Sequence, residues 1–239
     1  MNGTIKAVLG VLGLSLVVLT WQVIGKREAP VGGGSGLVYR VEYGGGTHYV
    51  AASFHLLKKS DYPLPIPYAT AFEAADELVF ELGDEAGRGR DETVEKFFTA
   101  GKYVGDQSLK TELPGEVYSK LAAAEKRLGL TAGSLDGYRP WLAALTLATA
   151  KHRSLGALSE FGMEGYFESL AREGGKGISG LESVEAQIGL FAGLSEEESA
   201  ELLDQTLAEV FLSEERTFYL VRAWRRGDAN EVDRFLGRG

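Results

Sequence analysis

The pattern of apolar and polar positions changes character along the chain. Residues 37–43 alternate between apolar and polar side chains, which is typical of a half-buried strand. Residues 44–46 are three glycines that permit a tight turn, and residues 47–54 resume an apolar run. We therefore predict a β-hairpin at the start of the folded part of the chain.

Most of the periodic segments after the hairpin have a helical pattern. Residues 68–75 suit a short helix and residues 77–82 suit a buried strand, so the predicted order begins strand, strand, helix, strand. One later strand-like run, residues 177–181, ends at Glu182. The remaining periodic segments predict helices, among them residues 92–99, 115–128, 139–152 and 165–173. The expected fold class is α/β (α+β), with a sheet core, a hairpin start and many flanking helices.

Two helix starts have a clear sequence signal. Ser195 is followed three residues later by Glu198, and Asp228 is followed by Glu231 at the same spacing. In a capping box the first side chain accepts from the backbone of the fourth residue, which satisfies a free N–H group. We expect helices to begin just after Ser195 and Asp228.

An uncharged apolar stretch occupies residues 7–25, about the 20 residues that a helix needs to cross a bilayer. We predict an uncleaved membrane anchor, because residues 20–25 offer a poor cleavage site for a signal peptide. A buried core helix is disfavoured, since the stretch is apolar all round and a glycine-rich linker follows it. The predicted organisation is an anchor or signal segment at 1–27, a linker at 28–36 and one domain at 37–239. Basic residues flank the stretch on both sides, so its orientation stays open.

Composition narrows the function classes. The chain of 239 residues is 44% hydrophobic, enough to bury one sizeable core. A net charge of -9 argues against nucleic acid as a partner, because phosphate binding needs clustered Lys and Arg. The absence of cysteine excludes disulfides, thiolate metal sites and cysteine nucleophiles. No P-loop, dinucleotide fingerprint or His-Glu-x-x-His zinc helix is present in the sequence.

His55 is the first candidate site residue. It stands where the predicted strand gives way to a loop, so the strand fixes the side chain while the loop leaves room for a ligand. Glu81 lies near the end of the next predicted strand, and the two side chains converge if those strands are parallel neighbours. A histidine and a carboxylate together form a metal-binding or acid/base pair. The alternative for Glu81 is a strand end that is simply exposed, and the alternative for His55 is a structural histidine whose hydrogen bonds are satisfied.

The other histidines and acids have simpler interpretations. His48 lies seven residues before His55, an odd offset, and is expected to be an exposed hairpin residue. His152 ends a predicted helix, where a positive charge complements the helix dipole. Glu182 ends a strand as Glu81 does, whereas Glu185 falls in the first turn of a helix, a place that attracts acids in any case.

A series of short motifs extends over nearly all of the chain after the linker. They are Ser53-Phe54-His55-Leu56, Tyr62-Pro63-Leu64-Pro65, the run at 75–82, Arg139-Pro140-Trp141, Gly162-Met163-Glu164, Gly175-Lys176-Gly177, the run at 181–187, and Trp224-Arg225-Arg226-Gly227-Asp228. In order and spacing they resemble the TraB/GumN family, whose extracytoplasmic animal relatives include the Tiki Wnt-cleaving proteases.

The resemblance implies a metal-dependent peptidase or hydrolase. His55 and Glu81 are then the expected metal ligands, and Glu182 is a third ligand or the base that activates water. Glu164 and Gln187 are expected to position a peptide or protein substrate. Manganese or cobalt is the implied metal, with zinc as an alternative.

The resemblance also implies an extracytoplasmic, bacterial, membrane-anchored protein, either periplasmic or at the cell surface. A non-enzymatic alternative is a membrane protein that binds or sequesters pheromone-like peptides. A third possibility is a helical interaction domain whose acids only solubilise its surface. The oligomeric state stays open.

Two departures from the family pattern concern the site. The first histidine motif of the family has glycine three residues before the histidine, where this chain has Ala52. The methyl group is expected to crowd a ligand or to resist a positive φ, at a cost of about 1 kcal/mol or more. The second glycine-histidine motif of the family is not in this sequence, which ends at Gly239. We therefore expect a chain that is incomplete at its C-terminus, is inactive, or has its site completed by another polypeptide.

Overall fold

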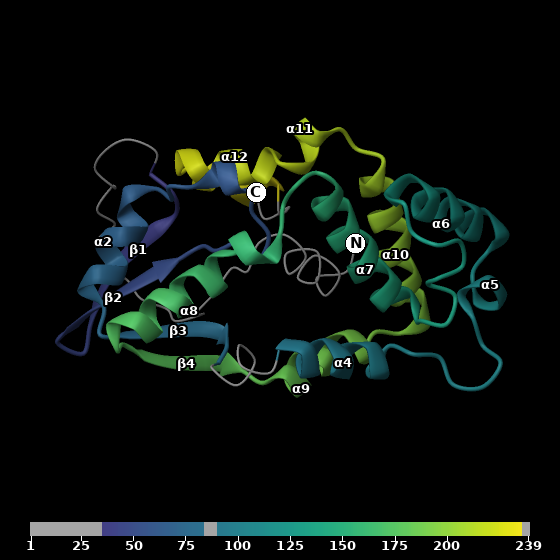
Figure 1. Ribbon diagram of the computed structural model, residues 1–239, viewed down its shortest axis with the longest axis horizontal. Coiled ribbons are helices and arrows are strands. Elements are labelled where there is room, and N and C mark those ends of the chain that lie inside the picture. The colour runs from purple at the N-terminus through teal and green to yellow at the C-terminus, as the bar shows by residue number, and fades with distance from the viewer. Residues whose placement is uncertain (1–34, 84–89, 236–239) are drawn as a thin grey trace. The chain divides into compact units, whose positions relative to one another are not determined.

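The computed structural model describes residues 35–83 and 90–235, and Figure 1 shows its elements. The fold is mixed α+β, which confirms the predicted class at that level. The described chain forms two compact units, each built from segments far apart in sequence. We call residues 35–83, 157–181 and 218–235 the hairpin unit, and residues 90–156 and 182–217 the helical unit.

The hairpin unit begins with the predicted β-hairpin. Strands β1 (Val38–Tyr43) and β2 (Gly46–Ala51) are antiparallel, and the turn residues Gly44 and Gly45 have positive φ values of 61° and 81°. Glycine adopts such angles without steric cost, and they match the twist of a two-residue hairpin turn. Strand β2 ends at Ala51, earlier than the apolar run predicted, because the backbone beyond Ala52 bonds to other parts of the unit.

A second sheet lies in the same unit, except for its last residue, Glu182, which belongs to the helical unit. Strand β3 (Glu77–Leu82) has the predicted bounds and pairs with β4 (Gly177–Glu182). Gly177 N donates to Asp76 O over 3.2 Å at the start of both strands, and Gly180, farther along β4, lies against Gly83, just past the end of β3, so β3 and β4 run in the same direction (Figure 1). Within the described residues each sheet has two strands, and β2 and β3 belong to different sheets. The expected pairing of these two strands as parallel neighbours is therefore wrong.

Short helices and 3-10 turns complete the hairpin unit. A buried hydrogen-bonded pair holds them to the strands: Trp224 Nε1 donates to Tyr68 Oη over 2.6 Å, and that hydroxyl donates to Ala52 O over 2.6 Å. Both side chains need these partners, because a buried polar group without one is costly. The elements are η1 (Lys59–Asp61), α2 (Ile66–Ala74), η2 (Ser159–Phe161), α8 (Met163–Gly174), α12 (Tyr219–Arg226) and α13 (Ala229–Phe235).

The helical unit has its core between α7 (Pro140–Ser154) and α10 (Glu196–Val210), which pack side by side in Figure 1. Trp141, Leu147 and Leu203 are fully buried there. The other helices of the unit are α4 (Arg90–Ala100), α5 (Leu109–Glu112), α6 (Gly115–Leu128), α9 (Val184–Ala192) and α11 (Glu214–Thr217).

The predicted helix starts are confirmed at both caps. Ser195 Oγ accepts from Glu198 N over 3.2 Å while Glu198 accepts from Ser195 N over 3.0 Å, a complete capping box. Asp228 Oδ1 accepts from Glu231 N over 2.9 Å. Helix α2 starts two residues before the predicted position, since the first turn of a helix tolerates Pro67.

His152 lies in the last turn of α7, as expected. Its environment does not favour a positive charge, however. Burial lowers the pKa of His152, outweighing the hydrogen bond of 2.8 Å between its ring Nδ1 and Ala148 O, and nearby Lys151 lowers it further. His152 therefore does not act as a cationic cap at neutral pH.

Across residues 35–83 and 90–235, no helix has the length and apolarity needed to span a membrane. The apolar stretch at 7–25, predicted as an anchor, lies outside the described residues.

Candidate functional site

The candidate site centres on His55 in the hairpin unit. His55 follows β2 in a segment whose backbone bonds to the chain leading into α8. Phe54 O accepts from Met163 N over 2.9 Å, and Leu57 O accepts from Leu158 N over 2.9 Å. These two bonds fix the backbone of the segment on both sides of His55.

Gly162 permits this close approach. A Cβ atom at position 162 would fall on the carbonyl oxygen of His55 and would lie 3.0 Å from Ser159 O. Only a glycine therefore fits between the His55 backbone and the first turn of α8. Tyr62 contacts the residues just before α8, because its hydroxyl donates to Phe161 O, at the end of η2, over 3.0 Å.

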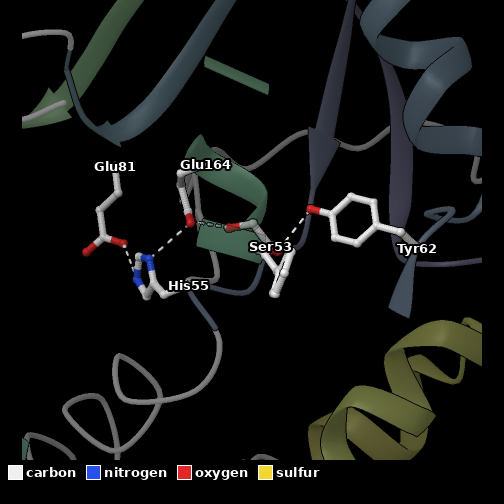
Figure 2. A network of polar contacts seen from close by, with 6 residues as sticks. Ser53, His55, Tyr62, Glu81 and Glu164 are labelled. Carbon is white, nitrogen blue, oxygen red and sulfur yellow. Dashed lines mark hydrogen bonds and ion pairs between the residues drawn. The ribbon is translucent and has the colours of Figure 1, made fainter. Parts of the chain in front are cut away.

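Glu164 connects α8 to His55. It lies in the first turn of the helix, and its Oε2 is 3.1 Å from His55 Nδ1. Its other oxygen, Oε1, accepts from Ser53 Oγ over 2.7 Å. Figure 2 shows the Glu164 carboxylate between Ser53 and His55. Two hydrogen bonds thus orient the carboxylate, which in turn orients the imidazole ring.

Glu81 approaches the opposite side of the ring. Its Oε2 lies 3.9 Å from His55 Nε2, and Figure 2 shows the imidazole between the two carboxylates. The His55 side chain is 43% exposed, compared with 21% for Glu81 and 25% for Glu164. The site is therefore open to solvent at the histidine and more enclosed at the acids. The side chains of His55 and Glu81 do converge, although their strands are not neighbours.

The two carboxylates determine the charge of His55. Burial lowers the pKa of His55, but the charge and hydrogen bond of Glu164, with a smaller contribution from Glu81, outweigh it and raise this pKa to about 8. For Glu164, burial raises the pKa. The charge of His55 and the hydrogen bonds from His55 and Ser53 lower the same pKa by more, so the net shift is downward. At neutral pH the pair is an imidazolium beside a carboxylate.

The charge state of Glu164 determines which ring nitrogen of His55 keeps its hydrogen. An ionised Glu164 can only accept hydrogen bonds, so Nδ1 of His55 must be the donor. Loss of a proton from the ring therefore occurs at Nε2, on the side that faces Glu81. Above the pKa of His55, the Nε2 atom carries a free lone pair and can act as a ligand to a cation.

The other predicted site residues lie in the helical unit. Glu182 is the exposed last residue of β4, and Gln187 lies in α9. Glu185, on the same helix, forms an ion pair with Lys96 over 3.0 Å, as an ordinary surface acid does. His48 is exposed on the hairpin, as expected. The roles predicted for Glu182 and Gln187 stay predictions.

Ala52 does not carry the expected backbone strain. No residue other than glycine has a positive φ in the described ranges, so the methyl group of Ala52 meets no conformational penalty. Ala52 is buried, its N–H donates to Leu37 O over 2.9 Å, and its carbonyl accepts from Tyr68. The residue is part of the buried core of the hairpin unit.

The sequence interpretation missed two features of the site. Ser53 belongs to the motif Ser53-Phe54-His55-Leu56, but the sequence suggested no role for it. Glu164 was expected to contact substrate. Only a contact across 109 residues of sequence reveals that Glu164 pairs with His55. One sequence signal favoured an ordered Glu164 side chain. Glu164 lies two residues after Gly162 at the start of a helix, where the helix dipole stabilises a carboxylate.

The donor set around His55 is partial. Within residues 35–83 and 90–235, no group of three or more histidines and carboxylates has a metal-binding arrangement. His55 Nε2 and Glu81 Oε2 are the two atoms that face each other at a distance suited to sharing one ion, since ligand bonds of about 2 Å from each would bridge most of the gap.

Comparison with known proteins places the chain in context. A family model described as the TraB/PrgY/gumN family matches residues 37–237. Searches among curated proteins and among solved structures return no significant match.

Proposed function

Because the chain belongs to the TraB/PrgY/gumN family, we propose that it is a metal-dependent hydrolase of peptide bonds, with His55 and Glu81 as metal ligands. The proposal depends on the arrangement of the two carboxylates around the ring of His55. Glu164 accepts from Nδ1 of His55 over 3.1 Å, and Nε2 faces the Glu81 carboxylate across 3.9 Å. Metal-binding histidines typically donate a hydrogen bond from the N–H of their second ring nitrogen to a carboxylate in this way, which fixes the tautomer and raises the basicity of the ligand.

The chain's own residues would prepare the ligand. Ser53 and His55 hold both oxygens of Glu164, so the imidazole ring has little freedom to rotate. Glu81 approaches the other side of the ring from β3. For Glu164, these two hydrogen bonds favour an orienting role over the substrate contact predicted from sequence.

A bound divalent metal would act as a Lewis acid on the peptide carbonyl or on water. Imidazole and carboxylate suit manganese, cobalt and zinc, so the donor chemistry fits the metals that the family resemblance implies. Catalytic sites usually have three protein ligands. Glu182 stays the proposed third ligand or base, and Gln187 the proposed substrate-positioning residue.

The proposal is tested by calorimetric titration of the full chain with manganese, cobalt and zinc. We expect saturable single-site binding that is lost in His55→Ala and weakened in Glu164→Gln. His48→Ala is the matched control, because it removes an exposed histidine of the same hairpin region and should leave binding unchanged. Equal affinity in the wild type and in a folded His55→Ala variant would refute the ligand assignment.

The hydrolase part needs its own measurement. A casein digest incubated with the full chain and manganese should lose defined peptides over time, as followed by mass spectrometry, and the His55→Ala variant should leave the digest intact. The same turnover by both proteins would point to a contaminating peptidase.

A second candidate function is non-enzymatic binding or sequestration of peptides. It is favoured by the charge state of the site: an imidazolium with a pKa of about 8 between two carboxylates is neutralised without any metal. This candidate predicts peptide binding that does not depend on metal and is not followed by cleavage. The calorimetric and digest experiments separate the two functions.

We also propose that residues 7–25 anchor the protein in a membrane with the domain outside the cytoplasm. The support is the apolar composition of this stretch alone. Fractionation of cells that express the full chain, followed by protease treatment of spheroplasts, tests both parts. A chain found in the soluble fraction would overturn the anchor, and a domain protected from protease would overturn the orientation.

A further inference from the structure

The two faces of the β-hairpin differ in charge. Directly opposite residues of antiparallel strands point to the same side, and side chains alternate along each strand. One face of β1 and β2 therefore carries no Asp, Glu, Lys or Arg, and we call it the tyrosine face: Tyr39, Val41, Tyr43, His48 and Val50. The opposite face carries the ion pair between Arg40 and Glu42 and the hydrogen bond from Thr47 to Glu42. The hairpin is thus amphipathic.

The tyrosine face is only partly covered by the part of the chain that the structure describes. Tyr39 is 43% exposed and Tyr43 is 59% exposed, while Val41 and Val50 are partly buried. A tyrosine has an apolar ring and a polar hydroxyl, which suits it to surroundings that are apolar on one side and wet on the other. Tyrosine is enriched at membrane–water interfaces for this reason. The face therefore has the chemistry of a surface that lies on lipid headgroups.

The connection within the chain brings this face close to a membrane. Residues 26–36 join the apolar stretch at 7–25 to Leu37, which directly precedes β1. A connection of about eleven residues spans at most about 40 Å when fully extended. Strands of six residues are about 20 Å long. The whole hairpin therefore lies within reach of the bilayer that residues 7–25 are proposed to enter.

An apolar side chain is also exposed where the chain enters the hairpin unit. Gly36 lies beside Pro65, since a Cβ atom at position 36 would be 3.3 Å from the Pro65 Cβ. The residue after Pro65 is Ile66, which is 69% exposed. The part of the unit nearest to the connecting segment therefore also offers apolar surface to lipid.

We propose that the tyrosine face lies on the membrane surface, with Tyr39 and Tyr43 at the level of the lipid headgroups, and holds the hairpin unit against the bilayer. This rests on the proposed anchor, because residues 7–25 bring the hairpin to the membrane. Arg40 and Glu42, on the opposite face, then stay in water, where their charges keep their hydration. The bilayer is the occupant, rather than a second copy of the chain, because the chain's own connection brings it to this face.

Lipid quenching of single labels tests the contact, since the sequence has no cysteine to compete for the label. His48→Cys places a bimane fluorophore on the tyrosine face. Thr47→Cys, the matched control, places it one residue away on the opposite face, and both positions are exposed. The full chain is reconstituted in vesicles of phosphatidylcholine and phosphatidylglycerol, with and without phosphatidylcholine that carries a spin label on its headgroup. We expect at least threefold stronger quenching in His48→Cys. Equal quenching in the two variants would overturn the proposal.

Variants of the two tyrosines test their part in the contact. Tyr39→Ser with Tyr43→Ser should lower the quenching of the His48→Cys label to the level of Thr47→Cys, whereas tryptophan at both positions should preserve it. Tyr219→Ser, which removes an exposed tyrosine of α12, is the control and should change nothing. Melting temperatures report whether each variant folds, and if the serine variant does not, the two labels in the unchanged hairpin decide alone. Full quenching in a folded serine variant would contradict the role of the tyrosines.

An alkaline carbonate wash of the vesicles separates this inference from the proposed anchor. If the full chain stays with the vesicles but neither label is quenched, the anchor stands and the face assignment is wrong. If the wash removes the chain but quenching before the wash is selective for His48→Cys, the face assignment is correct and the anchor is wrong. Pyrene attached to His48→Cys reports a second copy of the chain. Excimer emission without lipid quenching would show that the tyrosine face pairs two chains, which would overturn the proposal.

Discussion

His55 and Glu164 stand 109 residues apart in sequence, yet His55 Nδ1 lies 3.1 Å from Glu164 Oε2. The contact links the segment after β2 to the first turn of α8. It raises the pKa of the histidine and lowers that of the acid, each against the effect of burial. The predictions that follow depend on this pair and on the residues that hold it in place.

Replacing Glu164 should lower the pKa of His55. In Glu164→Gln the charge that raises the pKa of His55 is gone while burial still lowers it, so the pKa should fall from about 8 to the ordinary 6.5 or below. Glu81→Gln should lower this pKa less, because its oxygen is farther from the ring, at 3.9 Å instead of 3.1 Å. Imidazole NMR titration measures both, with signals assigned through His48→Gln and His152→Gln. An unshifted His55 signal in Glu164→Gln would contradict the pairing.

The pH dependence of stability follows from the same shifts. The folded pKa of His55 is raised above 6.5, so its contribution to the free energy of unfolding is fully present below pH 6.5 and is lost as the pH rises through about 8. The folded pKa of Glu164 is lowered, so its contribution is present above pH 4.5 and is lost as the pH falls. The pair should stabilise the metal-free protein most between pH 4.5 and 6.5.

Urea denaturation of the wild type and His55→Gln across this pH range tests the sign. The stability difference between the two proteins should shrink between pH 6.5 and 8.5. His152 should behave in the opposite way, because burial lowers its pKa below the ordinary 6.5. Its contribution is present above pH 6.5 and is lost as the pH falls, so the difference between wild type and His152→Gln should shrink on acidification.

Gly162→Ala should disturb the site through packing. The added methyl group would collide with His55 O, so the first turn of α8 must shift and carry Glu164 away from the ring. We expect a loss of about 1–3 kcal/mol in the free energy of unfolding, the usual scale of overpacking, together with weaker metal binding. Gly189→Ala on α9 is the control, since open space surrounds that position and alanine favours a helix by up to about 1 kcal/mol. A Gly162→Ala protein as stable as the wild type would show that α8 adjusts without cost.

Ala52→Gly tests the departure from the family pattern. Because the φ angle of Ala52 is not positive, glycine relieves no strain there. The change removes a buried methyl group and adds freedom to the unfolded chain, so stability should fall by about 1 kcal/mol. Thermal and urea unfolding measure this loss. A gain in metal affinity in the same variant would instead indicate that the methyl group crowds the ligand.

Much of the local structure could be predicted, because the signals are local. The bounds of β3 and α6 agree with the patterns at 77–82 and 115–128, and the caps at Ser195 and Asp228 were identified from residues three positions apart. Hydrophobic period and capping chemistry depend on neighbours in sequence, so a sequence alone carries them.

The site was only partly predictable. His55 and Glu81 were identified as a converging pair, but the reason given, parallel neighbouring strands, was wrong, since β2 and β3 belong to different sheets. The pairing of Glu164 with His55 depends on the backbone bond between Met163 and Phe54 and on the missing side chain at Gly162. No periodicity encodes contacts of this kind.

By itself the sequence determined the hairpin, the main helices, the mixed α+β class and the membership of the family. The tertiary structure alone decided which acid pairs with His55, because a hydrogen bond depends on the positions of two residues in space. The entropy of closing a loop changes little with its length, so it does not select one of the many acids as the partner. The tertiary structure also decided that β3 pairs with β4, since strand pairing between residues a hundred positions apart leaves no local trace.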